Sequence, residues 1–123
     1  MAKIMVVDDS KIMRKILTGT LTDAGHEVIK DAANGKDALD ALETMEIKPD
    51  LITLDITMPV MDGIEALKNI REKYPDVKVV MVSAAGQKSK VLEALKAGAL
   101  DFLQKPFEKE DVVAVIGKFV NNA

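Results

Sequence analysis

The chain has 123 residues, of which 48% are hydrophobic and 30% are charged, and these values predict one globular domain, residues 1–123, with a sizeable core. It contains no cysteine and a single histidine, which excludes disulfides and thiolate nucleophiles and leaves any zinc site or Ser-His-Asp triad dependent on His26. A net charge of −3, only 3% aromatic residues and the lack of a basic run argue against nucleic-acid binding.

The first predicted element is a short strand from Ile4 to Val7, which stops at Asp8-Asp9-Ser10. It begins so close to the start of the sequence that we expect no signal peptide, and no apolar run approaches the length of about 18 residues that crosses a membrane. Asp9 or Ser10 is expected to cap a helix that ends at Gly25. The apolar positions of that helix are Met13, Ile16, Leu17, Leu21 and Ala24.

The middle of the sequence predicts a short strand at 28–29, a turn at Asn34-Gly35, a helix at 38–45 and a mostly apolar strand that begins at Leu51 and ends in Asp55. Turn residues continue from Pro59 to Asp62-Gly63, which opens a helix that Pro75 stops. His26 lies between Gly25 and Glu27 in a helix-to-strand turn, where we expect an exposed side chain without a role.

The last third predicts a strand at 77–82 that ends at Ser83, a helix at 88–97 closed by Gly98, a strand at 101–103 that leads to Lys105-Pro106, and a final helix with apolar positions between 112 and 120. We expect Val91, Leu92 and Leu95 to form the apolar stripe of the helix at 88–97. Five strands alternate with five helices through short connections. This pattern predicts a doubly wound α/β fold with a parallel sheet, and we expect the flavodoxin-like strand order 2-1-3-4-5.

Polar side chains follow four of the five predicted strands. Asp8-Asp9 follows the first strand, Asp55 ends the third, Ser83 follows the fourth, and Lys105 follows the fifth. In the expected order these four strands are neighbours, and the second strand is the edge. Because the carboxyl ends of parallel strands meet at one edge of a sheet, we expect these side chains to form one site.

Three carboxylates in one site repel one another, and a hard divalent cation with oxygen ligands relieves that repulsion. Mg²⁺ suits such a site and would leave Asp55 ionised as a nucleophile. Lys105 supplies a positive charge and Ser83 a hydroxyl donor for the oxygens of an incoming phosphoryl group. The residues therefore predict an acceptor that forms an aspartyl phosphate on Asp55.

These motifs together resemble the receiver domain of bacterial response regulators. The similarity runs from about Lys3 to Val120. Within that family the chain is most similar to the single-domain regulators of chemotaxis. The motifs that carry the resemblance are Val7-Asp8-Asp9-Ser10, Asp55 with Met58-Pro59, Asp62-Gly63, Ser83-Ala84 and Lys105-Pro106-Phe107.

The resemblance implies a role for each residue of the metal site. A partner histidine kinase would phosphorylate Asp55. Asp9 would ligate Mg²⁺ directly and Asp8 through a water molecule. The backbone carbonyl of Thr57 and the Asp55 carboxylate would complete the protein ligands. The set implied for the metal is thus Asp8, Asp9, Asp55 and Thr57.

The resemblance also implies a switch. Ser83 and Lys105 would hold the phosphoryl oxygens, and Phe102 occupies an aromatic switch position where many relatives carry tyrosine. Phenylalanine can move into the space behind Ser83 but offers no hydroxyl to a partner. The peptide bond between Lys105 and Pro106 is expected to be cis, which proline tolerates at a cost of about 0.5–1 kcal/mol.

The implied function is a phosphorylation-activated switch of a two-component system, acting as a cytoplasmic monomer. The protein would not be an enzyme in the usual sense, although it would catalyse its own phosphorylation and dephosphorylation. The face formed by the fourth helix, fifth strand and fifth helix would bind an output partner, such as a component of the flagellar motor switch. A phosphatase is a further expected partner.

Other functions remain open or are disfavoured by particular residues. Within the switch class, the chain could be a phosphorelay intermediate, a receiver of another two-component pathway or part of a longer regulator. A haloacid-dehalogenase-type phosphatase would need a second aspartate where Thr57 stands, and a cap domain for which the chain has no length. A flavin-binding module is rejected, because Asp8-Asp9 would repel a phosphate after the first strand.

Overall fold

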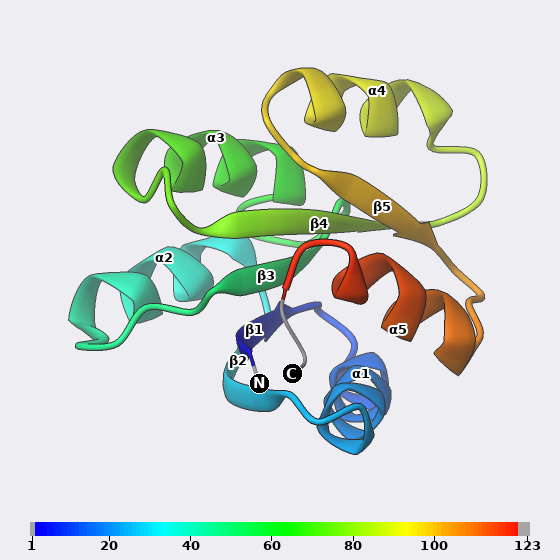
Figure 1. Cartoon of the computed structure of the whole chain (residues 1–123). Coiled ribbons are helices and arrows are strands. Elements are labelled where there is room, and N and C mark those ends of the chain that lie inside the picture. Colours follow the sequence, from blue (N-terminus) through cyan, green and yellow to red (C-terminus); the bar gives the residue numbers. More distant parts are fainter. Residues whose placement is uncertain (1, 121–123) are drawn as a thin grey trace.

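The computed structural model of the chain describes residues 2–120, which form five strands and five helices in alternation. The strands are β1 (Lys3–Val7), β2 (Glu27–Ala32), β3 (Leu51–Asp55), β4 (Lys78–Ser83) and β5 (Asp101–Gln104). The helices are α1 (Lys11–Asp23), α2 (Gly35–Thr44), α3 (Gly63–Lys73), α4 (Lys88–Lys96) and α5 (Lys109–Gly117). All strand pairs are parallel, and the order β2-β1-β3-β4-β5 (Figure 1) confirms the predicted flavodoxin-like fold.

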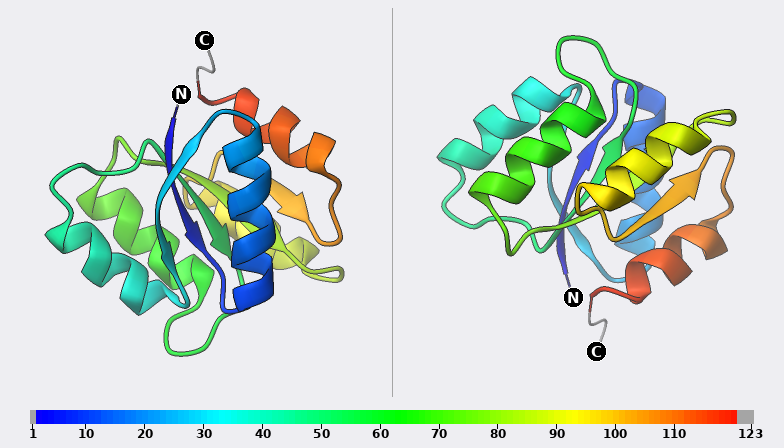
Figure 2. Two further views of the ribbon diagram at one scale, coloured as in Figure 1. Left: turned by 90° about the horizontal axis from the view of Figure 1, so that it is seen from below. Right: turned by 90° about the horizontal axis from the view of Figure 1, so that it is seen from above.

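Helices cover both faces of the sheet. Helices α1 and α5 lie on one face, whereas α2, α3 and α4 lie on the other (Figure 2). Because neighbouring residues of a strand point to opposite faces, the apolar strands feed two separate clusters. Ile52 and Leu54 of β3 belong to the cluster under α2, α3 and α4, and Leu51 belongs to the cluster under α1 and α5. The central strands are therefore buried on both sides, as in other parallel sheets.

Three helices begin with a side-chain cap. Ser10, Asn34 and Asp62 each accept a hydrogen bond from the backbone N–H three residues further on, at 3.2, 2.9 and 2.9 Å. The choice left open between Asp9 and Ser10 is thus resolved in favour of Ser10. Asn34-Gly35, predicted as a turn before the helix, instead caps and begins α2, because the asparagine side chain satisfies a free N–H of the first turn.

The prediction for His26 was wrong. Its side chain is only 4% exposed, and its Nδ1 accepts a hydrogen bond from the backbone N–H of Ala2 at 3.3 Å. The turn after α1 folds the histidine back against the start of β1, which the sequence of a short turn does not reveal. Burial lowers the pKa of the imidazole.

In two helices, fewer of the predicted apolar positions are buried than their helical spacing indicated. Ile16 in α1 is 49% exposed and Leu92 in α4 is 50% exposed, although both were expected to face the core. In α4 the buried positions are Val91 and Ala94, because this helix covers the sheet near its β5 edge and buries only a narrow stripe. The second strand is also longer than predicted, and of its six residues three are exposed and one is buried. Within residues 2–120, no helix is long and apolar enough to cross a membrane.

Val60, in the loop between β3 and α3, has a left-handed backbone with φ of 68° and a side chain that is 78% exposed. A β-branched residue is strained there, whereas asparagine tolerates this conformation. We expect Val60→Asn to raise the free energy of unfolding by about 1 kcal/mol, measured by urea denaturation. Val60→Ala keeps a Cβ atom and should gain less. An asparagine variant that is less stable than the parent would contradict this explanation.

Candidate functional site

The carboxyl ends of β1, β3, β4 and β5 meet at one edge of the sheet, as the sequence predicted. In the register of the sheet, Val7 pairs with Leu54, and Asp55 pairs with Val82. One residue beyond these pairs, β1 continues into Asp8 and β4 ends at Ser83. The four neighbouring strands thus deliver their terminal polar residues to the same place.

Gly63 fixes the start of α3 against the end of β3. Its N–H donates a hydrogen bond to the Ile56 carbonyl at 2.7 Å. A Cβ atom on Gly63 would lie 2.0 Å from the carbonyl oxygen of Asp55, a distance that no side chain permits. The glycine after the Asp62 cap is therefore required by the close approach of the helix to the residue that carries the central carboxylate.

Lys105 places its ammonium group between two carboxylates. The Nζ atom lies 3.1 Å from Oδ2 of Asp8 and 3.4 Å from Oδ2 of Asp55. The backbone N–H of Lys105 donates a hydrogen bond to the Ser83 carbonyl at 2.7 Å, which ties the loop after β5 to the end of β4. The peptide bond between Lys105 and Pro106 is cis, as predicted.

Asp8 has a buried carboxylate with an incomplete set of partners. Its Oδ1 accepts a hydrogen bond from the Ser10 N–H at 2.8 Å. Its Oδ2 is buried and, among residues 2–120, receives no aligned hydrogen bond, although the Lys105 ammonium is close. One oxygen each of Asp8, Asp9 and Asp55 lie within 4.8 Å of one another. Such a set of carboxylate oxygens, one of them without a donor, fits a hard divalent cation such as Mg²⁺.

Burial and a neighbouring negative charge disfavour the ionised form of Asp55. Its pKa is raised from 3.8 to about 6, first by burial and then by the negative charge of Asp8, and the ammonium of Lys105 offsets part of this rise. For Lys105, burial opposes the charged form, but the pKa is raised overall because Asp8 and Asp55 both stabilise the ammonium. Without a metal, Lys105 is thus the counter-ion of the site.

Ser83 and Phe102 line one cavity. Ser83 is buried at the end of β4, and Phe102 on β5 is 37% exposed. The cavity has a volume of about 260 Å³ and is also lined by Val91 of α4. It offers space for a side chain between the end of β4 and the aromatic ring.

Thr57 lies on the exposed loop after β3, and its side chain has a partner that the sequence did not suggest. Its Oγ1 accepts a hydrogen bond from Nε2 of Gln87 at 2.7 Å, and Oε1 of Gln87 accepts one from the Ala84 N–H at 2.7 Å. Among the described residues, no hydrogen bond joins the Thr57 hydroxyl to a carboxylate. A glutamine at the start of a helix carries no sequence signal for such a role.

Arg14 is a second residue that the sequence reading missed. Its Nη1 donates to the Asp8 carbonyl at 2.7 Å, and its Nε donates to Oδ2 of Asp31 at 2.9 Å. The guanidinium thus ties the loop after β1 to the edge strand β2 and gives Asp31, which stood outside the motifs, a structural partner. Three basic residues in α1 and two acidic residues in β2 offer several possible pairs, so the sequence did not single out this one.

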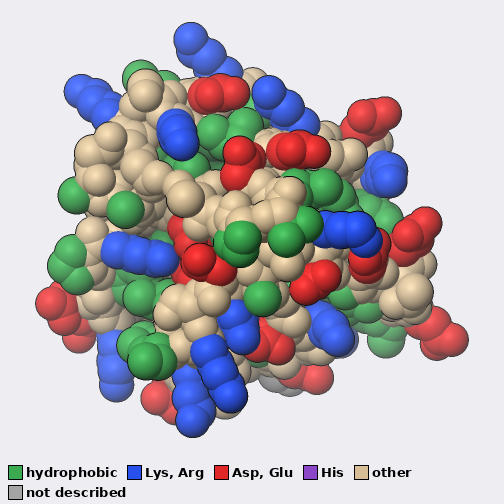
Figure 3. All heavy atoms as spheres, turned by 180° about the vertical axis from the view of Figure 1, so that it is seen from behind, with side chains coloured by type: hydrophobic (Ala, Val, Ile, Leu, Met, Phe, Trp, Pro, Cys, Tyr) green, Lys and Arg blue, Asp and Glu red, His purple; other side chains and the backbone are tan. Residues whose placement is uncertain are grey.

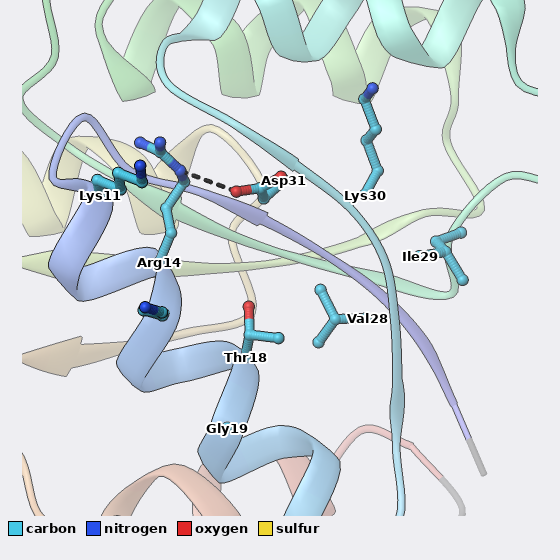
Figure 4. A pocket seen from close by; sticks show the side chains of 9 residues that line it. Lys11, Arg14, Thr18, Gly19, Val28, Ile29, Lys30 and Asp31 are labelled. Carbon is cyan, nitrogen blue, oxygen red and sulfur yellow. Dashed lines mark hydrogen bonds and ion pairs between the residues drawn. The ribbon is translucent and has the colours of Figure 1, made fainter.

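Arg14 and Asp31 also line a groove that has a volume of about 630 Å³ and lies between α1 and β2 (Figure 4). Lys11 and Lys30 flank it, and neither Asp55 nor Lys105 reaches it. The lining of the groove thus shows that it is separate from the carboxylate site.

Seen from behind, the surface of the molecule mixes acidic and basic side chains, and several basic ones gather in its lower left part (Figure 3).

The sequence profile of the response regulator receiver domain matches residues 4–117. The chemotaxis protein CheY of Thermotoga maritima is 45% identical over 116 residues, which cover 94% of this chain and 95% of that protein. A protein-glutamate methylesterase/protein-glutamine glutaminase of Archaeoglobus fulgidus is 49% identical over 106 residues, which cover 85% of this chain but 30% of that protein.

Solved structures show the same similarity. The structure of a CheX-CheY complex with BeF3 and Mg²⁺ from Borrelia burgdorferi contains a chain with a TM-score of 0.89 and 38% sequence identity. The similarity covers 97% of the chain described here and 90% of that chain. The sequence and the fold thus point to the same group of proteins.

Proposed function

Because the chain belongs to the response regulator receiver domain family, we propose that it is a phosphorylation-activated switch of a two-component system that controls chemotaxis. The observation that carries this proposal is the position of Asp55, which has the carboxylates of Asp8 and Asp9 on one side and the ammonium of Lys105 3.4 Å away. We further propose that residues 1–123 form one receiver domain that acts in the cytoplasm as a monomer.

The proposed reaction is transfer of a phosphoryl group from a histidine kinase to Asp55. An Asp55 carboxylate oxygen forms a bond to phosphorus while the bond from phosphorus to the histidine nitrogen breaks, and the histidine keeps that electron pair. Asp8, Asp9, Asp55 and the Thr57 carbonyl would hold Mg²⁺, which supplies positive charge for the carboxylates and the phosphoryl oxygens. Lys105 and the Ser83 hydroxyl would bind the remaining phosphoryl oxygens.

Labelling with a small acyl phosphate tests this assignment. With Mg²⁺ present, the parent chain should gain one phosphoryl group, detected as a mass increase, and Asp55→Asn should gain none because the amide is not a nucleophile. Asp31→Asn is the matched control, since this carboxylate pairs with Arg14 and belongs neither to the carboxylate cluster nor to the contacts of Lys105, and it should be labelled like the parent. Undiminished labelling of Asp55→Asn would place the acceptor elsewhere.

The metal site makes a separate prediction. Asp9→Ala removes an exposed carboxylate of the cluster and should weaken Mg²⁺ binding by about tenfold or more, measured by calorimetry without phosphate. Asp31→Ala should leave the affinity nearly unchanged. Mg²⁺ binding should also weaken as the pH falls towards the pKa of Asp55, because a protonated carboxyl group is a poor ligand. Equal losses in the two variants would move the metal to another site.

The proposed output is a change of the face formed by α4, β5 and α5. A phosphoryl group would draw the Ser83 hydroxyl towards it, and Phe102 would turn into the cavity that both residues line. Covering most of that ring is worth on the order of 1–2 kcal/mol, which biases two states without locking either one. Ser83→Ala should therefore still be labelled at Asp55 but lose most of the phosphorylation-dependent gain in partner affinity, measured by titration with the partner.

The proposed partners are a histidine kinase, an output protein such as a flagellar motor switch component, and a phosphatase. The Borrelia complex pairs CheY with CheX, which supports an additional protein partner at the phosphorylated state. The Archaeoglobus relative carries its similar segment within a longer protein, which keeps a receiver of another pathway as the second candidate. We also propose that the chain catalyses its own phosphorylation and dephosphorylation but acts as a switch rather than on a separate substrate.

A further inference from the structure

Gln87 joins the loops that follow two neighbouring strands. Its Oε1 accepts a hydrogen bond from the Ala84 N–H, and its Nε2 donates one to the Thr57 hydroxyl, both at 2.7 Å. Ala84 directly follows Ser83 at the end of β4, and Thr57 follows Asp55 by two residues at the end of β3. These two contacts, called the Gln87 bridge below, therefore join the end of β3, which carries the acceptor, to the end of its neighbour β4.

The bridge occupies a backbone donor beside the acceptor. A phosphoryl group on Asp55 carries three outer oxygens, and each is more stable with a donor or a cation. The Lys105 ammonium and the Ser83 hydroxyl are two such groups. The next backbone donor, directly after β4, is the Ala84 N–H, and the Gln87 amide oxygen occupies it. One donor cannot make a full hydrogen bond to the glutamine and to the phosphoryl group at once.

Among residues 2–120, the Gln87 side chain makes no hydrogen bond besides these two, although its backbone carbonyl accepts one from the Val91 N–H at 2.9 Å. Gln87 is the N-cap residue of α4, but its side chain makes no capping hydrogen bond to the first turn. The preceding Gly86 has φ of 84°, and a Cβ atom added to it would meet nothing within 4 Å. The Gln87 side chain thus forms hydrogen bonds with the two loops and none with the first turn of its own helix.

We propose that Gln87 is a positioning residue that holds the loop between β4 and α4 in its unphosphorylated form, and that the phosphoryl group displaces it from Ala84. This inference rests on the proposed function and adds a residue that regulates the same site. A contact made in only one of two states shifts the equilibrium towards that state. Removing the Gln87 bridge should therefore favour the phosphorylated form.

The test is a titration of the full chain with beryllium fluoride, a phosphoryl mimic, in the presence of Mg²⁺. Gln87→Met keeps the length of the side chain but removes both hydrogen bonds. It should bind the mimic about three- to tenfold more tightly than the parent, as expected for one or two hydrogen bonds lost from the free state. The control Lys90→Ala changes an exposed residue of α4 and should leave the affinity unchanged.

A double-mutant cycle separates the bridge from a general structural effect. Thr57→Val removes the hydroxyl but keeps the backbone carbonyl assigned to the metal. If the bridge acts as proposed, Thr57→Val should have a smaller effect in the Gln87→Met background than in the parent. The amide resonance of Ala84 should shift in free Gln87→Met and should shift less on addition of the mimic. A merely destabilised loop would lower the unfolding temperature without tightening the binding.

The outcomes also distinguish the two proposals. Unchanged or weaker binding by Gln87→Met, with Asp55-dependent binding intact in the parent, would overturn the role of Gln87 and leave the proposed function standing. If the mimic bound equally well to Asp55→Asn, the acceptor assignment would fail, and the role of Gln87 would fail with it.

Discussion

Replacing Asp55 by asparagine is expected to stabilise the metal-free protein at neutral pH by about 3 kcal/mol, although it removes the proposed acceptor. The reason is the pKa of Asp55, which is raised from 3.8 to about 6 by burial and by the charge of Asp8. The folded state holds the proton of this carboxyl group more tightly than the unfolded chain does. Ionising Asp55 therefore costs the folded state free energy.

The pH dependence of the free energy of unfolding follows from the upward direction of this pKa shift. Below 3.8 the carboxyl group is protonated in both states, and its burial carries no charge penalty. Between 3.8 and about 6 the unfolded chain ionises first, so stability falls as the pH rises. Above about 6 the full penalty applies to the parent but not to Asp55→Asn. The advantage of the variant should thus be largest at neutral and higher pH and fade below the ordinary pKa of aspartate.

Urea unfolding with a chelator at constant ionic strength measures this difference across the pH range. Asp76→Asn changes an exposed aspartate and should shift the free energy of unfolding by less than about 0.5 kcal/mol. Adding Mg²⁺ should favour the parent, which keeps all three carboxylates. A variant whose advantage grows as the pH falls would show that Asp55 is stabilised, not destabilised, in its ionised form.

Replacing Lys105 by methionine should have the opposite effect on the metal-free protein. The Nζ atom lies within 3.4 Å of both Asp8 and Asp55, and among residues 2–120 no other cationic side chain reaches either carboxylate. Removing it leaves two buried carboxylates without a counter-ion. We expect a loss of about 3 kcal/mol in the free energy of unfolding, since breaking a buried pair costs far more than an exposed pair contributes.

The same variant should bind Mg²⁺ more tightly, by about tenfold, because the ammonium no longer competes for the carboxylates that would ligate the metal. Mg²⁺ should consequently restore part of the lost stability. Lys118→Met is the matched control, because Lys118 pairs with Asp101 at 3.0 Å on an exposed surface and should cost at most about 1 kcal/mol. Weaker Mg²⁺ binding by Lys105→Met would mean that the lysine supports the metal site instead of competing for it.

The fold was predictable because strands and turns are local patterns. Apolar runs bounded by glycine, proline and aspartate marked all five strands, and their alternation with helices indicated a parallel sheet. The errors arose where burial depends on tertiary contacts. His26 is buried because the chain turns back on β1, and Leu92 is exposed because α4 buries a narrow stripe. Neither fact is encoded in the spacing of nearby residues.

The site was predictable to the extent that strand ends determine it. Asp8, Asp9, Asp55 and Lys105 all lie where the carboxyl ends of adjacent strands meet, and the structure brings them together. The role of Gln87 was not predicted, because its contacts depend on where the start of α4 lies relative to the loop after β3. Hydrogen bonds of this kind leave no periodic pattern or motif in the sequence.

The close approach of Gly63 to the Asp55 carbonyl has a consequence for the direction in which a signal can travel. On that side of the acceptor, the start of α3 is in backbone contact with the end of β3, and the Gly63 N–H donates a hydrogen bond to the Ile56 carbonyl at 2.7 Å. On the other side, a Cβ atom on Gly86 would meet nothing within 4 Å, and the side chain of Gln87 ties this loop to Thr57. We therefore expect a displacement at the acceptor to move the start of α4 more than the start of α3.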